Sequence, residues 1–337
     1  MTDLLAQASL SSLARSMDAD ASQASQEEFQ QRVETAIQRS FVEGDAVSEL
    51  ELHQFMYDIS AHAILPPWDE NYFDCEHPVV LAAHRKAQDA WLAYDSARLA
   101  TGLTVPTTPE GFVAWASAEC ENHASGVTHP LFDFLAERAT FEQLRTFLGQ
   151  ETPFDIHFGD LVALLLPGVH GEPKIELAGN FWDEMGRGSV VSTHRQLRLN
   201  MMERVGVPLD GYLNDVSGFW IEELRLANMY FQSSASRRLA PQAIGMLLAT
   251  ELVVPGRIDR QIDGWRRLGL TDDEMHYLRE HVTVDVEHAQ GWLDHVVMPL
   301  AASRPDLLQE VGVGVLRRLD AALAVCDRAM AELESIE

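Results

Sequence analysis

The apolar residues of this chain recur with a helical period over most of its length, and alternating β patterns are almost absent. Long segments with this period include residues 78–101, 129–151 and 305–333. Because such a helix has one apolar stripe, each must bury that stripe against other helices. With 337 residues and 46% hydrophobic content, the chain has enough apolar side chains for a large core. The pattern therefore predicts an all-α bundle.

Breaks in the period place several helix ends. Pro109 is expected to open a helix, because proline is favoured at the first helical position. The segment after residue 173 is expected to be interrupted or bulged near Gly186 and Gly188. Thr271 is expected to cap a later helix, with Glu274 completing a capping box.

Composition excludes several classes of partner. The formal net charge is −27, from 52 acidic and 25 basic residues, so the surface repels phosphate groups. Neither nucleic acid nor an anionic membrane is an expected partner.

The N-terminus lacks the pattern of a secretory signal, and no uninterrupted apolar stretch reaches the ~18 residues of a membrane span. The cysteines, Cys75, Cys120 and Cys326, show no CxxC spacing, which is typical of reduced thiols in a cytoplasmic protein.

The segment 279–292 contains an unusual helical stripe. His281, Asp285 and His288 are separated by four and three positions, so they lie within about 60° of one another on a helix. Trp292 continues the same face. Polar side chains that point into a core need partners, because burying them alone is costly. A metal ion is one such partner.

Other segments contain further possible ligands. Glu251 lies in the apolar stretch MLLATELVV, where an unpaired carboxylate would be expensive to bury. His194 follows Glu184 by ten residues, which separates the two by about 80° on an ideal helix. Asp183 would align with His194 more closely, at about 20°. A bulge between the two helical stretches would rotate Glu184 into line.

These residues together resemble the haem-oxygenase-like di-iron oxidases, also called iron-containing redox enzymes. The family has a Glu and a His on one core helix, a Glu on a second and HxxxDxxH on a third, and NFWDEMG adds to the likeness. The resemblance implies a haem-oxygenase-like bundle over residues 126–337. It also implies that residues 1–125 form an N-terminal helical extension, which in members that N-oxygenate can serve for dimerisation. The implied metal ligands are Glu184, His194, Glu251, His281, Asp285 and His288.

The resemblance also implies a cofactor and a reaction. The expected cofactor is a pair of Fe(II) ions, with O2 as co-substrate and an external electron donor. The expected reaction is N-oxygenation of a free amino acid or small amine in natural-product biosynthesis, by a homodimer. The alternative within the family is oxidative C–C cleavage of an amino or fatty acid. An additional carboxylate can join the site in N-oxygenases, and the sequence leaves three candidates open, which are Glu151, Glu176 and Asp183.

Interpretations from other classes remain open at this point. A single histidine on an apolar face is more often a core residue than a ligand, so the chain could be a metal-free helical interaction protein. A thiaminase-like hydrolase would need a nucleophilic cysteine, and no cysteine lies on the predicted ligand helices. A substrate carboxylate would be bound by arginines, and the sequence does not rank the four nearest the predicted ligands, which are Arg187, Arg195, Arg225 and Arg257.

Overall fold

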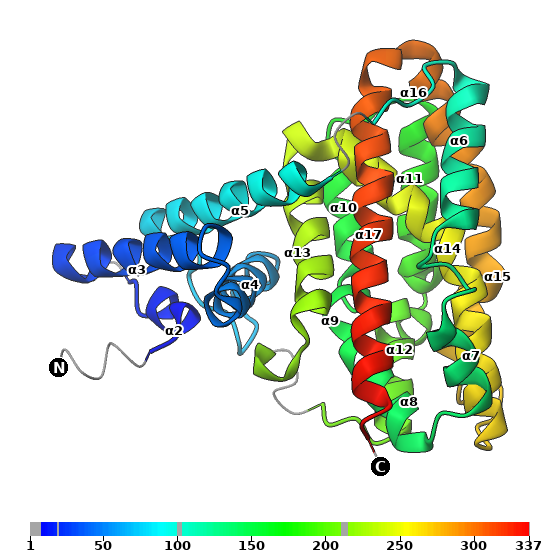
Figure 1. Ribbon diagram of the computed structural model, residues 1–337, viewed down its shortest axis with the longest axis horizontal. Coiled ribbons are helices and arrows are strands. Elements are labelled where there is room, and N and C mark those ends of the chain that lie inside the picture. The colour runs from blue at the N-terminus through cyan, green and yellow to red at the C-terminus, as the bar shows by residue number, and fades with distance from the viewer. Residues whose placement is uncertain (1–7, 19, 100–102, 210–214, 337) are drawn as a thin grey trace. The chain divides into compact units, whose positions relative to one another are not determined.

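The computed structural model describes residues 8–18, 20–99, 103–209 and 215–336, except for the side chains of residues 283–287. Within those residues the chain forms helices and no strand (Figure 1). The chain divides into two compact units. One comprises Met1–Gly102 with Gly211–Asn228, and the other comprises Leu103–Asp210 with Met229–Glu337. The sequence-based division after residue 125 stays a prediction.

The first unit is a small helical assembly. Its helices are α2 (Leu10–Arg15), α3 (Gln23–Phe41), α4 (Ala46–His62), α5 (Pro78–Arg98), η3 (Val216–Gly218) and the first part of α13 (Ile221–Ala235). Ser22 and Asp45 cap α3 and α4 through their side chains. Helix α3 packs against both α4 and α5, and Phe29 meets Phe55 edge to face, with ring centroids 5.9 Å apart.

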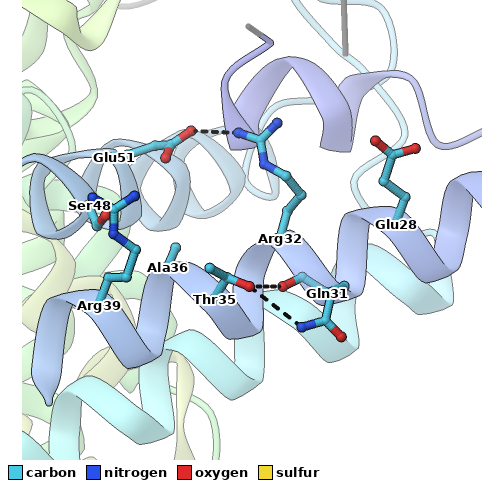
Figure 2. Close-up of a pocket in the computed structure, with 8 residues that line it drawn as sticks. All are labelled: Glu28, Gln31, Arg32, Thr35, Ala36, Arg39, Ser48 and Glu51. Atoms are coloured by element: carbon cyan, nitrogen blue, oxygen red, sulfur yellow. Dashed lines mark hydrogen bonds and ion pairs between the residues drawn. The ribbon is translucent and has the colours of Figure 1, made fainter. Parts of the chain in front are cut away.

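A pocket of about 460 Å³ lies over α3 and α4 in this unit. Figure 2 shows Arg32 reaching Glu51, with 3.4 Å between Nη2 and Oε1. Arg39, which also lines the pocket, lies 3.0 Å from a carboxylate oxygen of Asp45. Both arginines are therefore already paired with carboxylates of the same unit.

The second unit is a larger helical bundle. Its first half contains α6 (Pro109–Asn122), α7 (Pro130–Glu137), α8 (Phe141–Gln150), α9 (Thr152–Asp155), α10 (Phe158–Leu165), α11 (Glu172–Glu184), η1 (Gly186–Gly188), η2 (Val190–Ser192) and α12 (His194–Arg204). After the end of α13 come η4 (Arg237–Leu239), α14 (Ala240–Arg267), α15 (His276–Gly291), the π-helical η5 (Trp292–Val297), α16 (Met298–Ser303), η6 (Pro305–Leu307) and α17 (Leu308–Leu333).

Helix α14 is the central helix of this bundle and packs against α17, α15 and α7 (Figure 1). Glycines allow the close approach of α14 to α17. A Cβ atom on Gly245 would lie 1.9 Å from the Val311 carbonyl oxygen, and one on Gly314 would lie 2.0 Å from that of Gln242. The stretch Arg237–Arg267 is long and apolar enough to cross a membrane, but 67% of its most apolar window is buried inside the protein. Most of this apolar window therefore belongs to the core of the bundle.

The predicted helix ends agree with the structure in part. Helix α6 begins at Pro109 as predicted. The capping-box hydrogen bonds between Thr271 and Glu274 also form. Helix α15 nevertheless begins later, at His276, because these two residues close a turn that precedes the helix.

Candidate metal centre

A sharp turn between α11 and α12 brings Glu184 to His194. Glu184 is the last residue of α11, and His194 is the first of α12. Gly186 and Gly188 between them have positive φ angles of 60° and 89°, which glycine adopts without strain. Thr193 then caps α12 by accepting a hydrogen bond from the Gln196 amide. The predicted interruption near these glycines is therefore a complete break between two helices.

The first histidine–carboxylate group combines three helices. His194 Nδ1 lies 2.8 Å from Glu184 Oε1, and both side chains are buried. His281 on α15 joins them, and one potential ligand atom from each of the three residues lies within 4.8 Å of the others. His281 Nδ1 donates a hydrogen bond to the Tyr277 carbonyl oxygen at 2.8 Å. This bond leaves His281 Nε2 available as a ligand.

A second group lies around His288, seven residues further along α15. His288 Nε2 lies 2.9 Å from Asp183 Oδ2, and its Nδ1 lies 3.6 Å from Glu251 Oε2. Asp183 also accepts a hydrogen bond from Arg187 Nε at 2.6 Å. The Asp285 side chain lies outside the described residues. Asp183 thus contacts His288, although ideal-helix spacing aligned it with His194.

Burial and neighbouring charges set the protonation of these groups. Burial raises the pKa of Glu251, and the Glu184 carboxylate raises it further, against a lowering effect of His288. Burial lowers the pKa of His281 to about 4, and repulsion from His194 adds to this effect. Burial disfavours protonation of His194, but the adjacent Glu184 outweighs it and raises the His194 pKa. The two groups are close enough for their charges to interact.

The other two carboxylates proposed for the site make their hydrogen bonds elsewhere. Glu151 accepts a hydrogen bond from Gln261 Nε2 at 3.3 Å, and burial raises its pKa to about 8. Glu176 accepts one from Asn180 Nδ2 at 3.3 Å. Of the three candidates for an additional carboxylate, Asp183 is the one that contacts a predicted ligand whose side chain the structure describes.

Arg198 supports the site and was not among the residues singled out from the sequence. It is 1% exposed, and its Nη1 donates to Asp155 Oδ2 at 2.5 Å and to the Tyr277 hydroxyl at 3.2 Å. Because Arg198 lies one turn after His194 and Tyr277 lies one turn before His281, this network joins the helices that carry both histidines. The sequence signal for Arg198 is its position between the apolar residues Leu197 and Met201 on the same predicted helix.

The chemistry of the donor atoms fits iron. Glu184, His194 and His281 are two imidazoles and one carboxylate, a set typical of non-haem Fe(II) sites with open coordination positions. His288, Glu251 and Asp183 offer a second mixed set of nitrogen and oxygen donors. Buried carboxylates and imidazoles in such proximity are well suited to a cation, whose charge offsets the cost of burying the carboxylates.

Comparison with known proteins identifies the family. The model of a family described as iron-containing redox enzyme matches residues 145–323. This chain belongs to that family. The match covers α12, α14 and α15 and the end of α11, which carry the candidate centre. Among curated proteins, none matches the chain.

Solved structures share the fold. Two structures of a CADD-like protein of unknown function from Nostoc punctiforme PCC 73102 have TM-scores of 0.52. They are 14% and 17% identical to this chain, and the matches cover 67% of it and 96% or 98% of theirs. A domain of unknown function with a heme oxygenase-like fold from Shewanella denitrificans OS217 is 18% identical, with a TM-score of 0.49 over 67% of this chain and 91% of its own. With the family match, the prediction of an all-α, haem-oxygenase-like bundle is confirmed.

Proposed function

We propose that this iron-containing redox enzyme is a non-haem di-iron oxygenase that N-oxygenates the amine of a free amino acid or small amine. The observation that supports two metal ions is the pair of histidine–carboxylate groups. Glu184, His194 and His281 form one group, and His288 with Glu251 and Asp183 forms the other. Helices α11 and α15 contribute to both groups, so the two lie side by side.

Each of the two groups of residues would hold one ferrous ion. When bound, two ferrous ions supply electrons for the reduction of dioxygen. N-oxygenation places one oxygen atom in an N–H bond and reduces the other to water, so each turnover consumes two protons and two electrons from an external donor. Asp285 is a further proposed ligand, on the stripe that it shares with His281 and His288.

The surrounding chain keeps the ligands in position. The Tyr277 carbonyl fixes the orientation of the His281 ring through the bond to Nδ1. Arg198 holds the Tyr277 hydroxyl and the Asp155 carboxylate, and so ties α12 to α15 and α9. Burial of Glu184, His194 and Glu251 limits access of water to the centre.

The test is product analysis with iron-loaded enzyme, a reductant and a pool of amino acids and amines. N-oxygenation adds one oxygen atom to an amine, whereas the alternative C–C cleavage releases a smaller fragment, so mass spectrometry separates them. His281→Ala is expected to abolish either product. His276→Ala, on the same helix but 55% exposed, is the matched control and is expected to retain it. Oxygen-dependent fragments without an N-oxygenated product would contradict the N-oxygenase assignment.

A further inference from the structure

A buried arginine on α17 contacts Thr250, the residue before Glu251, and makes no ion pair with a described carboxylate. Arg318 on α17 is 3% exposed. Its Nε donates to Thr250 Oγ1 at 3.1 Å, while its buried Nη1 has no hydrogen-bond partner. In the part of the chain that the structure describes, no carboxylate oxygen lies within 4.0 Å of this guanidinium. Because burying a guanidinium without an anion is strongly unfavourable, the position calls for one.

A second cation adds to this demand. Arg257 on α14 donates from Nη2 to the Ser125 carbonyl oxygen, and its buried Nε has no hydrogen-bond partner. It follows Thr250 by seven positions, so the two lie on the same face of α14, about 20° apart. Burial lowers the pKa of Arg257 to about 10, and the Arg318 cation contributes to this lowering. Two cations therefore share this part of the interior.

Two carboxylates also act on these arginines, but neither supplies the anion. Asp155 pairs with Arg198 at 2.5 Å. Burial raises the pKa of Glu151 to about 8, so that it is mostly protonated at physiological pH.

The other polar groups around the two arginines do not supply the anion either. Tyr230 is hydrogen-bonded to Thr250 and to the Met246 carbonyl oxygen, and burial raises its pKa. Burial also raises the pKa of the Cys120 thiol to about 12, although Arg318 and Arg257 both act to lower it. Both groups are therefore neutral at physiological pH.

The other arginines near the ligands in sequence are engaged differently. Arg187 is exposed and paired with Asp183. Arg195 donates to the Ile156 carbonyl oxygen at 3.3 Å. Arg225 belongs to the first unit.

We propose that Arg318, together with Arg257, binds the carboxylate of the substrate, which is therefore a small carboxylate-bearing molecule such as an amino acid. A planar guanidinium matches a carboxylate with two parallel hydrogen bonds. Thr250, which Arg318 contacts, directly precedes Glu251 on α14. A carboxylate bound at Arg318 therefore leaves the rest of the molecule next to the candidate metal ligands. This inference rests on the proposed function, since it assigns the substrate class of the same site.

The experiment measures binding to the full-length protein by calorimetry under anaerobic conditions, with and without Fe(II). The probes are proteinogenic amino acids paired with the amines left by their decarboxylation, and monocarboxylates paired with their amides. At least one carboxylate is expected to bind, and its uncharged or decarboxylated partner to bind at least ten-fold more weakly. Arg318→Gln is expected to weaken carboxylate binding by roughly 30-fold or more, because it removes one side of a buried charged pair. Arg318→Lys is expected to lose less, since it keeps the charge.

Arg317→Gln is the matched control. Arg317 is the preceding residue on α17 and is 2% exposed, but its Nη1 donates to Gln242 Oε1 at 2.9 Å. Its loss is expected to lower stability and leave carboxylate binding within about three-fold of wild type. If Arg318→Gln fails to fold, Arg257→Gln takes its place, with the same loss of binding expected.

Two outcomes would overturn the inference. They are the absence of any carboxylate preference in the wild type, and equal weakening by the Arg317 and Arg318 substitutions. Iron-binding and oxygen-consumption assays on the same samples separate this failure from that of the proposed function. A chain that binds iron and consumes oxygen without preferring carboxylates contradicts the inference alone. A chain that binds carboxylates through Arg318 but binds no iron contradicts the proposed function alone.

Discussion

At the scale of single residues, the candidate centre depends on two histidines that each contact a carboxylate from another helix. His194 lies against Glu184 and His288 lies against Glu251. If the two groups hold separate irons, His194→Ala and His288→Ala should each reduce bound Fe(II) from about two to about one per chain. Iron content after anaerobic gel filtration measures this. Loss of all iron in both variants would contradict two separable sites, and His276→Ala should keep the wild-type content.

Two histidines of the first unit, the buried His53 and the half-buried His84, predict a pH dependence of stability. Burial lowers the pKa of His84 to about 4 and that of His53 well below its usual value. The unfolded chain therefore binds more protons than the folded chain as the pH falls below about 6.5, so the free energy of unfolding decreases between about pH 6.5 and 4. His84→Gln keeps a donor for the Met56 carbonyl oxygen, which His84 Nε2 contacts at 3.1 Å, but does not titrate.

The measurement is urea unfolding of the full chain at pH 7 and pH 5. Between these values the wild type should lose more stability than His84→Gln, by up to about 1.4 kcal/mol per pH unit. Comparison of the two proteins removes the contributions of groups that they share, including His281. An equal loss in both would show that His84 is not held neutral by the fold.

At the scale of elements, the contact of α14 with α17 requires glycine at its closest points. Gly245→Ala would place a methyl group 1.9 Å from the Val311 carbonyl oxygen, so the helices must move apart. We expect a loss of about 3 kcal/mol or more in the free energy of unfolding. Gly179→Ala, in α11 with no neighbour within 4 Å, is the matched control and should stabilise the protein by about 0.5–1 kcal/mol. Similar stabilities of the two variants in urea would contradict the close packing.

Helix periodicity predicted the elements better than it predicted their contacts. The stripe of His281 and His288 lies within one helix, α15, where spacing alone relates the side chains. Glu184 and His194 lie on separate helices, so their approach depends on the turn at Gly186 and Gly188, which ideal-helix angles do not describe. The contact of Asp183 with His288 depends on how α11 packs against its neighbours, which local sequence does not specify.

At the scale of the whole molecule, the homodimer remains a proposal based on the family resemblance. The first unit exposes large apolar side chains, including Trp68 at 85% and Val47 at 77%. If this unit dimerises, sedimentation should give twice the chain mass of 37.6 kDa, and Trp68→Glu should weaken the dimer because it introduces a charge into apolar surface. Trp182→Glu, 54% exposed in the second unit, is the control. A monomeric wild type would exclude the proposal.

We propose that the second unit holds two iron ions between α11, α12, α14 and α15. Anaerobic Fe(II) titration of the metal-free protein, followed by Mössbauer spectroscopy of the oxygen-exposed sample, tests it most directly. We expect about two ferrous ions to bind per chain and oxygen to convert them to a coupled diferric pair. Binding of no iron, or of one ion that remains magnetically isolated after oxidation, would contradict it.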